Sequence, residues 1–384
     1  MHILMFNYEF PPIGGGGGWV TYFLGKYFVE AGHKVLLITS QYSDLPKDEQ
    51  IEGFHVHRVP VRRKSKDVCG VYEMLTYVIS SSVSGFKVAR RFRPEIVQVF
   101  FGIPSGPGAY LLKKALRIPY VVFLGGRDVP RPNPDPPYYR WLYAILRPAI
   151  RAIWRNAAQV VACSAGLREL AWNTQPDAQI QVIPDGLELS RFSPVPRSIS
   201  PKPVRILTVG RIIPRKGFQF LIRALPQVIQ HATCDFEIEL VGDGPYRTEL
   251  VQLAETLGVS HKIHFAGSVP YPALPQKYSQ ADIFTLCSSA EGMPLVVLEA
   301  MGSGLPIVAS EVQGVKDLVA VGENGVLFTP GDVDGLAQGL ISLINDGKRR
   351  VQMGETSVAR VQKYDWKNIA QSYLEIYQRI LESQ

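Results

Sequence analysis

The sequence predicts an α/β protein built from two doubly wound, Rossmann-like domains. Short β-rich runs alternate with longer helical stretches along the 384 residues of the chain. This alternation is typical of parallel sheets that are covered by helices on both faces. A polar stretch with four prolines, FSPVPRSISPKPV, interrupts the alternation near the middle of the chain. We therefore expect one domain on each side of this stretch.

The first half opens with a strand, a loop, a helix and a second strand. ILMF is the predicted first strand, PPIGGGGG the loop and HKVLLITS the second strand, and the helix between them ends near Gly32. Later strands are expected at EIVQVF, YVVFL and QVVACS. We place this domain at residues 1–190.

The second half repeats the pattern. Its predicted strands are VRILTVG, FEIELVG, KIHFAG, DIFTLC and PIVAS, with helices between them. We place this domain at residues 204–364. Proline neither continues a helix nor fits a central strand, so residues 190–203 are predicted to be an interdomain linker.

The composition is that of a globular protein. Hydrophobic residues make up 46% and charged residues 20% of the chain, which is enough apolar material for a sizeable core. No apolar run reaches the about 18 residues that a membrane-spanning helix needs. The N-terminal run lacks a basic segment and is predicted to be a strand rather than a signal peptide. The four cysteines show no CxxC spacing, so we expect reduced thiols, a cytoplasmic location and no zinc site.

The positive charge is concentrated in the first half. Residues 1–195 carry 23 Lys and Arg against 15 Asp and Glu, a net charge of +8, whereas residues 196–384 carry 18 against 19, a net charge of −1. This asymmetry favours an anionic partner, such as a membrane, a lipid phosphate or a nucleic acid. In residues 138–158, Arg alternates with Trp and Tyr, which suits the cytoplasmic face of a membrane rather than a nucleic acid. An amphipathic helix packed within its own domain is the alternative.

Five consecutive glycines, Gly14–Gly18, lie between the first strand and the first helix. Bare backbone N–H groups at a helix N-terminus bind anions well, because the unpaired donors and the helix dipole point outward. The run matches neither GxGxxG nor GxxxxGK[ST], since Trp19 follows the last glycine. A flexible surface loop is the alternative, but a loop that lets a ligand approach the backbone explains five glycines better.

Two loops of the second half follow predicted strands. VGRIIPRKG places Arg211 and Lys216 at the carboxyl end of the first strand of this half, where open α/β sheets bind their ligands. A guanidinium and an ammonium together suit a diphosphate, although two solvated loop cations would look the same in sequence. VGDGPYRTEL contains Gly242 and Gly244 around Asp243, which a simple strand-to-helix turn would also explain.

The stretch EGMPLVVLEA holds two acids, Glu291 and Glu299, in apolar surroundings. Pro294 suits the first turn of a helix, so Glu291 would precede this helix and Glu299 would lie within it. The helix is apolar on nearly all sides, which predicts that it is buried. A carboxylate on a buried helix needs a partner. We expect a ligand there, with a capping acid and a structural ion pair as the alternative.

Other polar pairs are expected to be structural. Asp332 and Asp334 form a DxD, but they lie in a turn before a late amphipathic helix, so helix capping explains them better than a metal does. His55 and His57 alternate in a strand-like run with no acidic or Cys partner nearby in the sequence, so we expect no metal there.

Several of these motifs together resemble the retaining glycosyltransferases of family 4. The resemblance rests on the glycine loop, VGRIIPRKG, VGDGP, FAGSVP and EGMPLVVLEAM, in this order along the whole chain. The E-x7-E pair, Glu291 and Glu299, is its most specific element. It implies the GT-B fold, in which two Rossmann-like domains face each other across a cleft. The acceptor would bind to the first domain and the nucleotide-sugar donor to the second, and residues from about 365 to 384 would cross back to the first domain.

The resemblance also implies a role for each candidate residue. Arg211 and Lys216 would neutralise the diphosphate without a metal, Glu291 would contact the transferred sugar, and Glu299 would bind the ribose. The base would lie near Val269. Further contacts would come from the glycine loops and from the start of the buried helix: Gly15, Gly16, Gly242, Gly292, Met293, Pro294 and Leu295.

The chain departs from the family pattern at two places. Many members carry a histidine after the YVV strand, whereas this chain has GGRD there, so Asp128, with Arg127 beside it, is the candidate catalytic residue. The usual IPNG is IPDG here, with Asp185 in place of asparagine, and we expect this exchange to be tolerated.

The predicted activity is transfer of a sugar from a nucleoside-diphosphate sugar to a polysaccharide or lipid-linked glycan acceptor. Glu291, Asp128, Arg211 and Lys216 are the expected catalytic residues, UDP is the favoured nucleotide, and no cofactor is expected. A two-lobed sugar- or nucleotide-binding protein without catalysis is the alternative. A dehydrogenase is disfavoured because GxGxxG is absent from the sequence.

Overall fold

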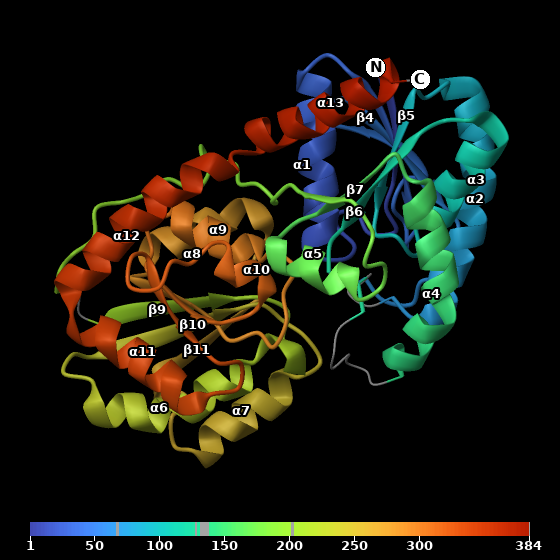
Figure 1. Ribbon diagram of the computed structural model, residues 1–384. Helices are drawn as coiled ribbons and strands as arrows, with labels where there is room; N and C mark the ends of the chain where they lie inside the picture. Colours follow the sequence, from blue (N-terminus) through green and yellow to red (C-terminus); the bar gives the residue numbers. More distant parts are fainter. Residues whose placement is uncertain (67–68, 127–128, 131–137, 201–202, 384) are drawn as a thin grey trace. The chain divides into compact units, whose positions relative to one another are not determined.

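The computed structural model describes residues 1–66, 69–126, 129–130, 138–200 and 203–383. It separates into two compact units (Figure 1). Unit 1 consists of Met1–Asp185 together with Trp366–Gln384, and unit 2 of Gly186–Asp365. Each unit contains its own sheet, so we describe the two separately.

The sheet of unit 1 has the strand order β3-β4-β2-β1-β5-β6-β7-β8 within the described residues. All neighbouring pairs are parallel except β3 and β4, which are antiparallel. The strands are β1 (His2–Phe6), β2 (Lys34–Ser40), β3 (Asp48–Ile51), β4 (Phe54–Val59), β5 (Ile96–Phe100), β6 (Tyr120–Leu124), β7 (Gln159–Ala162) and β8 (Ile180–Val182).

Helices cover both faces of this sheet. One face carries α2, α3 and α4, and the other carries α1 and α13 (Figure 1). The helices of unit 1 are α1 (Gly16–Glu30), α2 (Val71–Phe92), α3 (Gly106–Leu116), α4 (Tyr139–Asn156), α5 (Ala165–Trp172) and α13 (Trp366–Glu382). Trp366 stacks on Phe23 of α1 with ring centroids 5.4 Å apart, and Tyr377 donates a hydrogen bond of 2.6 Å to Gln98 of β5. These contacts hold the C-terminal helix on unit 1.

The sheet of unit 2 is parallel, with the order β11-β10-β9-β12-β13-β14 within the described residues. Its strands are β9 (Val204–Val209), β10 (Phe236–Val241), β11 (Ile263–Gly267), β12 (Ile283–Leu286), β13 (Ile307–Ser310) and β14 (Gly325–Phe328). Its helices are α6 (Phe218–His231), α7 (Arg247–Thr256), α8 (Leu274–Gln280), α9 (Leu295–Gly302), α10 (Gln313–Lys316), α11 (Val333–Asn345) and α12 (Gly347–Val361). Short 3-10 turns lie at Pro214–Lys216, Ser260–Lys262, Tyr271–Ala273 and Gln362–Tyr364.

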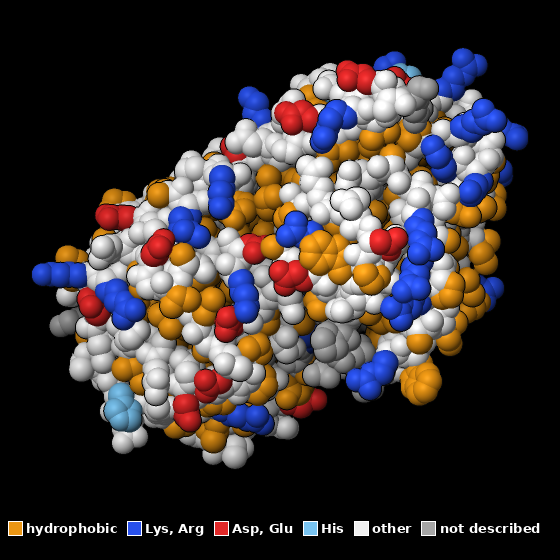
Figure 2. Space-filling view, viewed as in Figure 1, with side chains coloured by type: hydrophobic (Ala, Val, Ile, Leu, Met, Phe, Trp, Pro, Cys, Tyr) orange, Lys and Arg blue, Asp and Glu red, His pale blue; other side chains and the backbone are white. Residues whose placement is uncertain are grey.

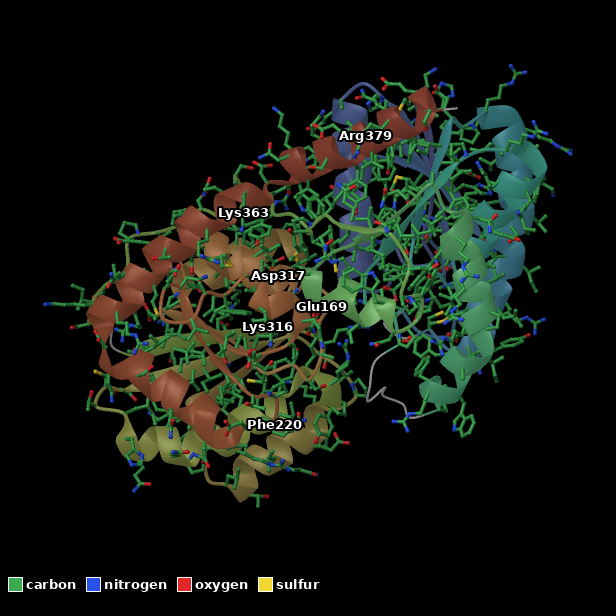
Figure 3. All side chains as sticks on the ribbon, viewed as in Figure 1. Glu169, Phe220, Lys316, Asp317, Lys363 and Arg379 are labelled. Carbon is green, nitrogen blue, oxygen red and sulfur yellow. The ribbon has the colours of Figure 1, made fainter. Side chains whose placement is uncertain are left out.

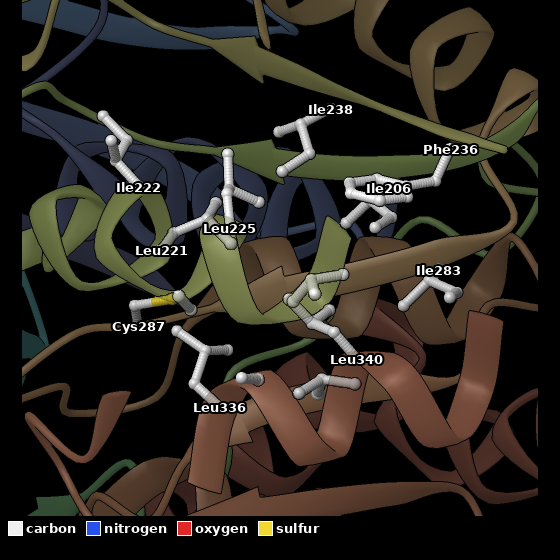
Figure 4. Packing of buried hydrophobic residues seen from close by; sticks show 14 of the residues in the cluster. Ile206, Leu221, Ile222, Leu225, Phe236, Ile238, Ile283, Cys287, Leu336 and Leu340 are labelled. Atoms are coloured by element: carbon white, nitrogen blue, oxygen red, sulfur yellow. The ribbon is translucent and has the colours of Figure 1, made fainter. Parts of the chain in front are cut away.

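The core of unit 2 is packed between the sheet and the helices α6 and α11. Leu221 and Leu225 of α6 and Leu336 of α11 face side chains of the central strands, including Ile206 and Ile238 (Figure 4). Each of these side chains is almost completely buried. This packing fixes the central strands, and with them the loops that leave their carboxyl ends.

The structure confirms the predicted fold class of two parallel-sheet, Rossmann-like units. Every predicted strand is present, and the predicted first helix is α1. The DxD is a helix cap, since the Asp332 carboxylate accepts a hydrogen bond of 2.9 Å from the Gly335 N–H at the start of α11. Among the described residues, no helix combines the length and the apolar character needed to cross a membrane.

In its described part, residues 192–200, the proline-rich stretch belongs to unit 2 and is not a free linker between the units. The chain enters unit 2 already at Gly186, and Phe192 packs edge-on against Tyr278 with ring centroids 5.6 Å apart. The Arg197 guanidinium then donates to the carbonyl oxygens of Tyr278 at 3.0 Å, Ser279 at 2.9 Å and Ser303 at 2.9 Å. Prolines prevent regular structure in this stretch, but a guanidinium that caps several carbonyl groups still fixes it to the unit.

Candidate active site

Two of the predicted loops lie side by side at the carboxyl edge of the unit 2 sheet, because their strands, β9 and β10, are neighbours. The Gly210 N–H donates to the Val241 carbonyl at 3.0 Å, and the Ile212 N–H donates to the Asp243 carbonyl at 2.8 Å. Backbone hydrogen bonds therefore join VGRIIPRKG to VGDGP. The loop that follows β12 leaves the same edge of the sheet on the other side of β9.

Glycines make the close approach of these loops possible. A Cβ atom on Gly242 would lie 1.9 Å from the Gly210 carbonyl oxygen, and one on Gly217 would lie 1.9 Å from the Cys287 carbonyl oxygen. Both glycines also have positive φ angles, +143° and +74°, which L side chains rarely adopt. These two positions accept only glycine without a shift of the backbone.

The central feature of this edge is an ion pair between Lys216 and Glu291. The Lys216 Nζ and the Glu291 Oε1 are 2.7 Å apart, and the side chains are 14% and 10% exposed. Beside them, the Arg215 guanidinium donates a hydrogen bond of 2.5 Å to the Ala290 carbonyl. The Arg215 carbonyl in turn accepts one of 2.9 Å from the Ser289 N–H. The turn that carries both cations is thus fixed to the loop that carries the acid.

Electrostatics keep Glu291 ionised. Burial acts to raise its pKa, but the neighbouring Lys216 and Arg215 outweigh burial and lower the pKa to about 2. Burial lowers the pKa of the Lys216 ammonium, and Glu291 acts against this shift. Arg211 is half-buried and near enough for its charge to lower the pKa of Lys216 as well. Positive charge therefore accumulates around one buried carboxylate.

The second acid of the E-x7-E pair lies deeper, on a helix that is buried as predicted. Glu299 is 4% exposed and accepts a hydrogen bond of 2.7 Å from the Tyr278 hydroxyl. Burial raises the pKa of Glu299 to about 7, and the bond from Tyr278 acts in the opposite direction. The carboxyl therefore has a protein partner but no cation beside it among the contacts described for it.

The start of α9 differs slightly from the prediction. Pro294 is the N-cap residue with an extended backbone (φ −81°, ψ 108°), and Leu295 is the first helical residue. Gly292 and Met293 are buried in the preceding loop. Gly314 of α10 packs so closely here that a Cβ on it would lie 1.9 Å from the Gly292 carbonyl oxygen.

The end of α10 and the loop after β11 flank this edge. Lys316, labelled in Figure 3, ends α10 and pairs with Glu311 at 2.9 Å. Val269 is half-buried in the loop that follows Gly267. The Gly267 carbonyl accepts a hydrogen bond of 2.8 Å from Gly242, so the Val269 loop is tied to the glycine loop after β10.

The predicted glycine loop belongs to unit 1, where α1 begins at Gly16 after the N-cap residue Gly15. Its surroundings differ from an open anion site, because the Glu9 carboxylate accepts a hydrogen bond of 3.3 Å from the Gly15 N–H. An anion at Gly15 would have to displace this carboxylate. Asp128 and Arg127 lie outside the described residues.

Two residues of the site were missed by the sequence analysis. Arg215 is adjacent to Lys216 in PRKG, and a run of two cations on a strand-end loop was the available signal. No feature of the sequence marked Tyr278 as a residue of the site, since nothing in the sequence distinguishes it from other tyrosines on helices. Only the fold brings its hydroxyl to Glu299.

Comparison with known proteins shows the family to which these two units belong. The family model described as glycosyl transferase 4-like domain matches residues 15–186, and the one described as glycosyl transferases group 1 matches residues 192–360. Together these two matches cover most of the chain, and each covers most of one unit.

Relatives of known name agree with the family models. An uncharacterized glycosyltransferase of Methanocaldococcus jannaschii is 29% identical over 402 aligned positions, which cover 100% of this chain and 99% of that protein. The N-acetyl-alpha-D-glucosaminyl L-malate synthase of Bacillus anthracis is 27% identical, with 96% and 95% covered.

Solved structures share the fold. The sucrose-phosphate synthase of Thermosynechococcus elongatus superposes with a TM-score of 0.85 at 21% identity over 100% of both chains. The Anabaena protein HepE, solved in complex with UDP and glucose, superposes with a TM-score of 0.76 at 21% identity, with 99% and 100% covered. This chain is therefore a glycosyltransferase with the GT-B fold, in which a glycosyl transferase 4-like domain precedes a glycosyl transferases group 1 domain.

Proposed function

We propose that this glycosyltransferase is a retaining, metal-independent enzyme that uses a nucleoside-diphosphate sugar and glycosylates a polysaccharide or a lipid-linked glycan. The observation that carries the proposal is the Lys216–Glu291 pair at the carboxyl edge of the unit 2 sheet. Two arginines, Arg211 and Arg215, lie close enough to change the pKa of Lys216. This is the chemistry that a departing diphosphate needs, because its charge grows as the bond to the sugar breaks.

The cations would act mainly in the transition state. When the bond between the anomeric carbon and the diphosphate breaks, its electron pair stays on the phosphate oxygen. Arg211 and Lys216 would stabilise that charge, and Lys216 is already held by its ion pair with Glu291 before reaction. The positive charge for which other enzymes use a metal ion would thus be supplied by side chains.

Glu291 would bind the sugar that is transferred. Because its pKa is about 2, the carboxylate can accept hydrogen bonds from sugar hydroxyls at neutral pH, while Lys216 is shared with the phosphate. The acceptor hydroxyl would attack on the face that the diphosphate leaves, which retains the configuration. The hydroxyl proton would pass to the leaving phosphate oxygen.

The rest of the donor would lie along the same edge. Glu299 would accept hydrogen bonds from the ribose hydroxyls, and Val269 would contact the base. Gly242, Gly292, Met293, Pro294 and Leu295 would supply backbone contacts, and Gly15 and Gly16 of unit 1 would add theirs if Glu9 releases the Gly15 N–H. Asp128 stays a candidate for acceptor binding or catalysis.

UDP remains the favoured nucleotide of the proposal. The Anabaena protein HepE was solved with UDP and glucose, whereas the name of a relative from Mycolicibacterium smegmatis, 31% identical over 55% of this chain, specifies GDP-mannose. The choice between bases is therefore part of the test and does not affect the chemistry at the diphosphate.

The test is release of nucleoside diphosphate from a panel of UDP-, GDP- and ADP-sugars by the purified protein. We expect slow hydrolysis of one donor class, and a rise in the melting temperature with the matching nucleoside diphosphate. A retained anomeric configuration in the sugar or glycan product would support the retaining mechanism. If no donor is consumed and no nucleotide raises the melting temperature, the proposal is wrong.

A membrane surface is the proposed partner of unit 1. The N-terminal half of α4 exposes Trp141 (75%) and Ile145 (74%), with Arg140 between Tyr139 and Trp141 in the sequence. The C-terminal half of the same helix buries Ile153 and Trp154. The C-terminal half is thus packed within its own unit, and the exposed N-terminal half supports the proposed membrane contact.

A second exposed apolar stripe strengthens this assignment. On α2, the side chains at one helical face are exposed at Tyr72, Leu75, Ile79 and Val83. Helix α2 lies on the same face of the sheet as α4, with α3 between them (Figure 1). Lys and Arg side chains mixed with hydrophobic ones are visible over the α4 side of unit 1 (Figure 2). Exposed aromatic and apolar groups among basic residues are typical of a protein that binds an anionic membrane surface.

A further inference from the structure

A cluster of two histidines and one aspartate lies at the edge of the unit 1 sheet. His57 Nδ1 is 2.6 Å and His55 Nε2 is 3.2 Å from the same carboxylate oxygen, Asp48 Oδ1. The three ligand atoms all lie within 4.8 Å of one another. The sequence suggested that these histidines have no acidic partner, and the structure shows that this was wrong.

The β3–β4 hairpin explains why the sequence hid this cluster. His55 and His57 are two positions apart on β4, so their side chains project from the same face of the strand. Strand β3 runs antiparallel beside β4, and the register pairs Asp48 directly with His57. Antiparallel partners on one face bring their Cβ atoms close together, although they are nine positions apart in the chain.

The cluster has the composition of a site for a transition metal ion. Imidazole nitrogen and carboxylate oxygen are ligands that suit zinc, nickel and cobalt ions. Ligand atoms bound about 2.1 Å from a tetrahedral ion lie about 3.4 Å from one another. The Asp48 oxygen lies 2.6 Å from the His57 nitrogen and 3.2 Å from the His55 nitrogen, and no two of the three ligand atoms are more than 4.8 Å apart. Side-chain rotations alone can therefore bring the three atoms to the separation that a tetrahedral ion requires.

The surroundings also suit a bound ion. Asp48 is exposed and the two histidines are half-buried, so water can complete the coordination shell. The shared hydrogen bonds to Asp48 already orient both imidazoles. A metal ion would replace the ring protons that now face this carboxylate.

We propose that Asp48, His55 and His57 form a binding site for one divalent transition metal ion, such as Zn²⁺, on the β3–β4 hairpin. The ion would link the edge strand β3 to β4 through side chains from both strands. Its effect would be on the stability of this edge of unit 1, and the proposal does not depend on the proposed donor chemistry in unit 2.

The test is calorimetric titration of ZnCl₂ into protein that carries no histidine tag and has been stripped with EDTA. Wild type should bind one equivalent of Zn²⁺ at this site, and the ion should raise the melting temperature in a way that EDTA reverses. His55→Gln and His57→Gln should each weaken Zn²⁺ binding by at least about 10-fold. Loss of a residue that only hydrogen-bonds to a metal ligand already weakens metal binding by about 10-fold or more, and loss of a ligand itself should weaken it no less. All three residues are at the surface, and circular dichroism would verify folding.

Two control changes make the result specific. The protein that is otherwise wild type and all variants would carry Cys234→Ser, because Cys234 is an exposed thiol that could bind zinc by itself. His231→Gln serves as the matched control, since His231 is an exposed histidine of unit 2 whose ring is hydrogen-bonded only to the Gln227 carbonyl among the contacts described for it. The proposal is overturned if wild type binds no stoichiometric ion, or if His55→Gln and His57→Gln bind Zn²⁺ as tightly as His231→Gln does.

Discussion

Lys216 and Glu291 combine a structural and a proposed chemical role in one contact. Their pair is nearly buried, and a buried pair stabilises a fold weakly because desolvation offsets most of the attraction. Removal of one partner is costly, however, because it leaves a charge buried and unpaired. The pair is better explained as a charge arrangement kept ready for a ligand than as a source of stability.

Replacement of Lys216 by alanine should lower the rate of sugar transfer by about 10²–10³-fold, the usual effect of losing one group that stabilises the leaving charge. Glu291→Gln should lower it as well, because a neutral amide binds sugar hydroxyls less strongly than a carboxylate. Steady-state kinetics with the best donor would measure both effects. Wild-type rates in either variant would contradict the assignment.

Loss of folding must be separated from loss of chemistry in these variants. Each single change should lower the free energy of unfolding, by up to about 3–5 kcal/mol. The double variant Lys216→Met with Glu291→Gln removes both charges and should recover part of that stability. Its activity should stay as low as that of the single variants, as denaturant unfolding and kinetics together would show.

Asp185 explains how the departure from the family's IPNG can be tolerated. Asp185 is 5% exposed, and burial raises the pKa of its carboxyl from 3.8 to about 8. Burial therefore favours the protonated, uncharged form of this carboxyl, which is the form that resembles the family's asparagine. A protonated carboxyl can also both donate and accept a hydrogen bond, as an amide can.

The same shift predicts how stability depends on pH. The folded protein binds the Asp185 proton more tightly than the unfolded chain does, so its contribution to stability is complete below pH 3.8 and is lost as the pH rises to about 8. The loss is at most about 1.4 kcal/mol per pH unit. Asp185→Asn should remove this loss, so its melting temperature should exceed that of wild type by more at pH 9 than at pH 5. Equal differences at both pH values would show that Asp185 is ionised when folded.

At the level of elements, the strand-end loops of unit 2 are set by glycines that no other residue can replace without strain. Gly217 follows the turn with Arg215 and Lys216, and it has a positive φ in contact with the Cys287 carbonyl. This one residue therefore fixes the distance between the cation turn and the loop that leads to Glu291.

Gly217→Ala should cost more than the about 1–2 kcal/mol of a left-handed alanine, and should also reduce transfer, because the added Cβ pushes the cation turn away from the acid. Gly258→Ala is the matched control, since Gly258 has a similar φ of +69° but no atom within 4 Å of the added Cβ. Kinetics should show a loss of sugar transfer in Gly217→Ala only, and thermal unfolding should show the larger loss of stability in that variant. Equal behaviour of the two variants would contradict the role of the close approach.

The predictable elements were those with strong local patterns. The central strands of both sheets are short apolar runs between turn residues, such as YVVFL, and all were predicted correctly. The strands that were not predicted, β3, β8 and β14, are only three or four residues long, and β3, with the sequence DEQI, is largely polar. Pairing with a neighbour makes them strands, so no local signal marks them.

The site shows the same limit. Arg211, Lys216, Glu291 and Glu299 stand in motifs that the sequence alone pointed to. The bond from Tyr278 to Glu299, the position of Glu9 at the glycine loop and the Asp48–histidine cluster depend on contacts between distant segments, which a sequence without its fold does not display.

At the level of the whole molecule, the surplus of positive charge and a group of exposed apolar side chains occur in the same half of the chain. The half with a surplus of positive charge is the half whose helices α2 and α4 expose apolar side chains. Apolar groups that lie singly on a surface need no explanation, but a stripe along one helix accompanied by basic residues does.

The protein should sediment with anionic liposomes at low salt and less so at high salt, because ions screen the attraction. A variant with Trp141→Ala and Ile145→Ala should bind less, whereas Val321→Ala, which removes an exposed apolar side chain of unit 2, should bind as wild type does. Sedimentation with neutral liposomes is the reference. Binding that is independent of salt, or unchanged in the double variant, would contradict a membrane role for α4.

The central claim is that the Lys216–Glu291 edge of unit 2 binds the diphosphate of the donor, and calorimetric titration of UDP, GDP and ADP tests it most directly. One nucleotide should bind wild type, and Lys216→Ala should weaken this binding by about 10–100-fold, the value of a charge-assisted hydrogen bond. Lys277→Ala is the control, since Lys277 forms a similar pair with Glu239 at 2.6 Å elsewhere in the unit. Unchanged affinity in Lys216→Ala, or an equal loss in Lys277→Ala, would contradict the account.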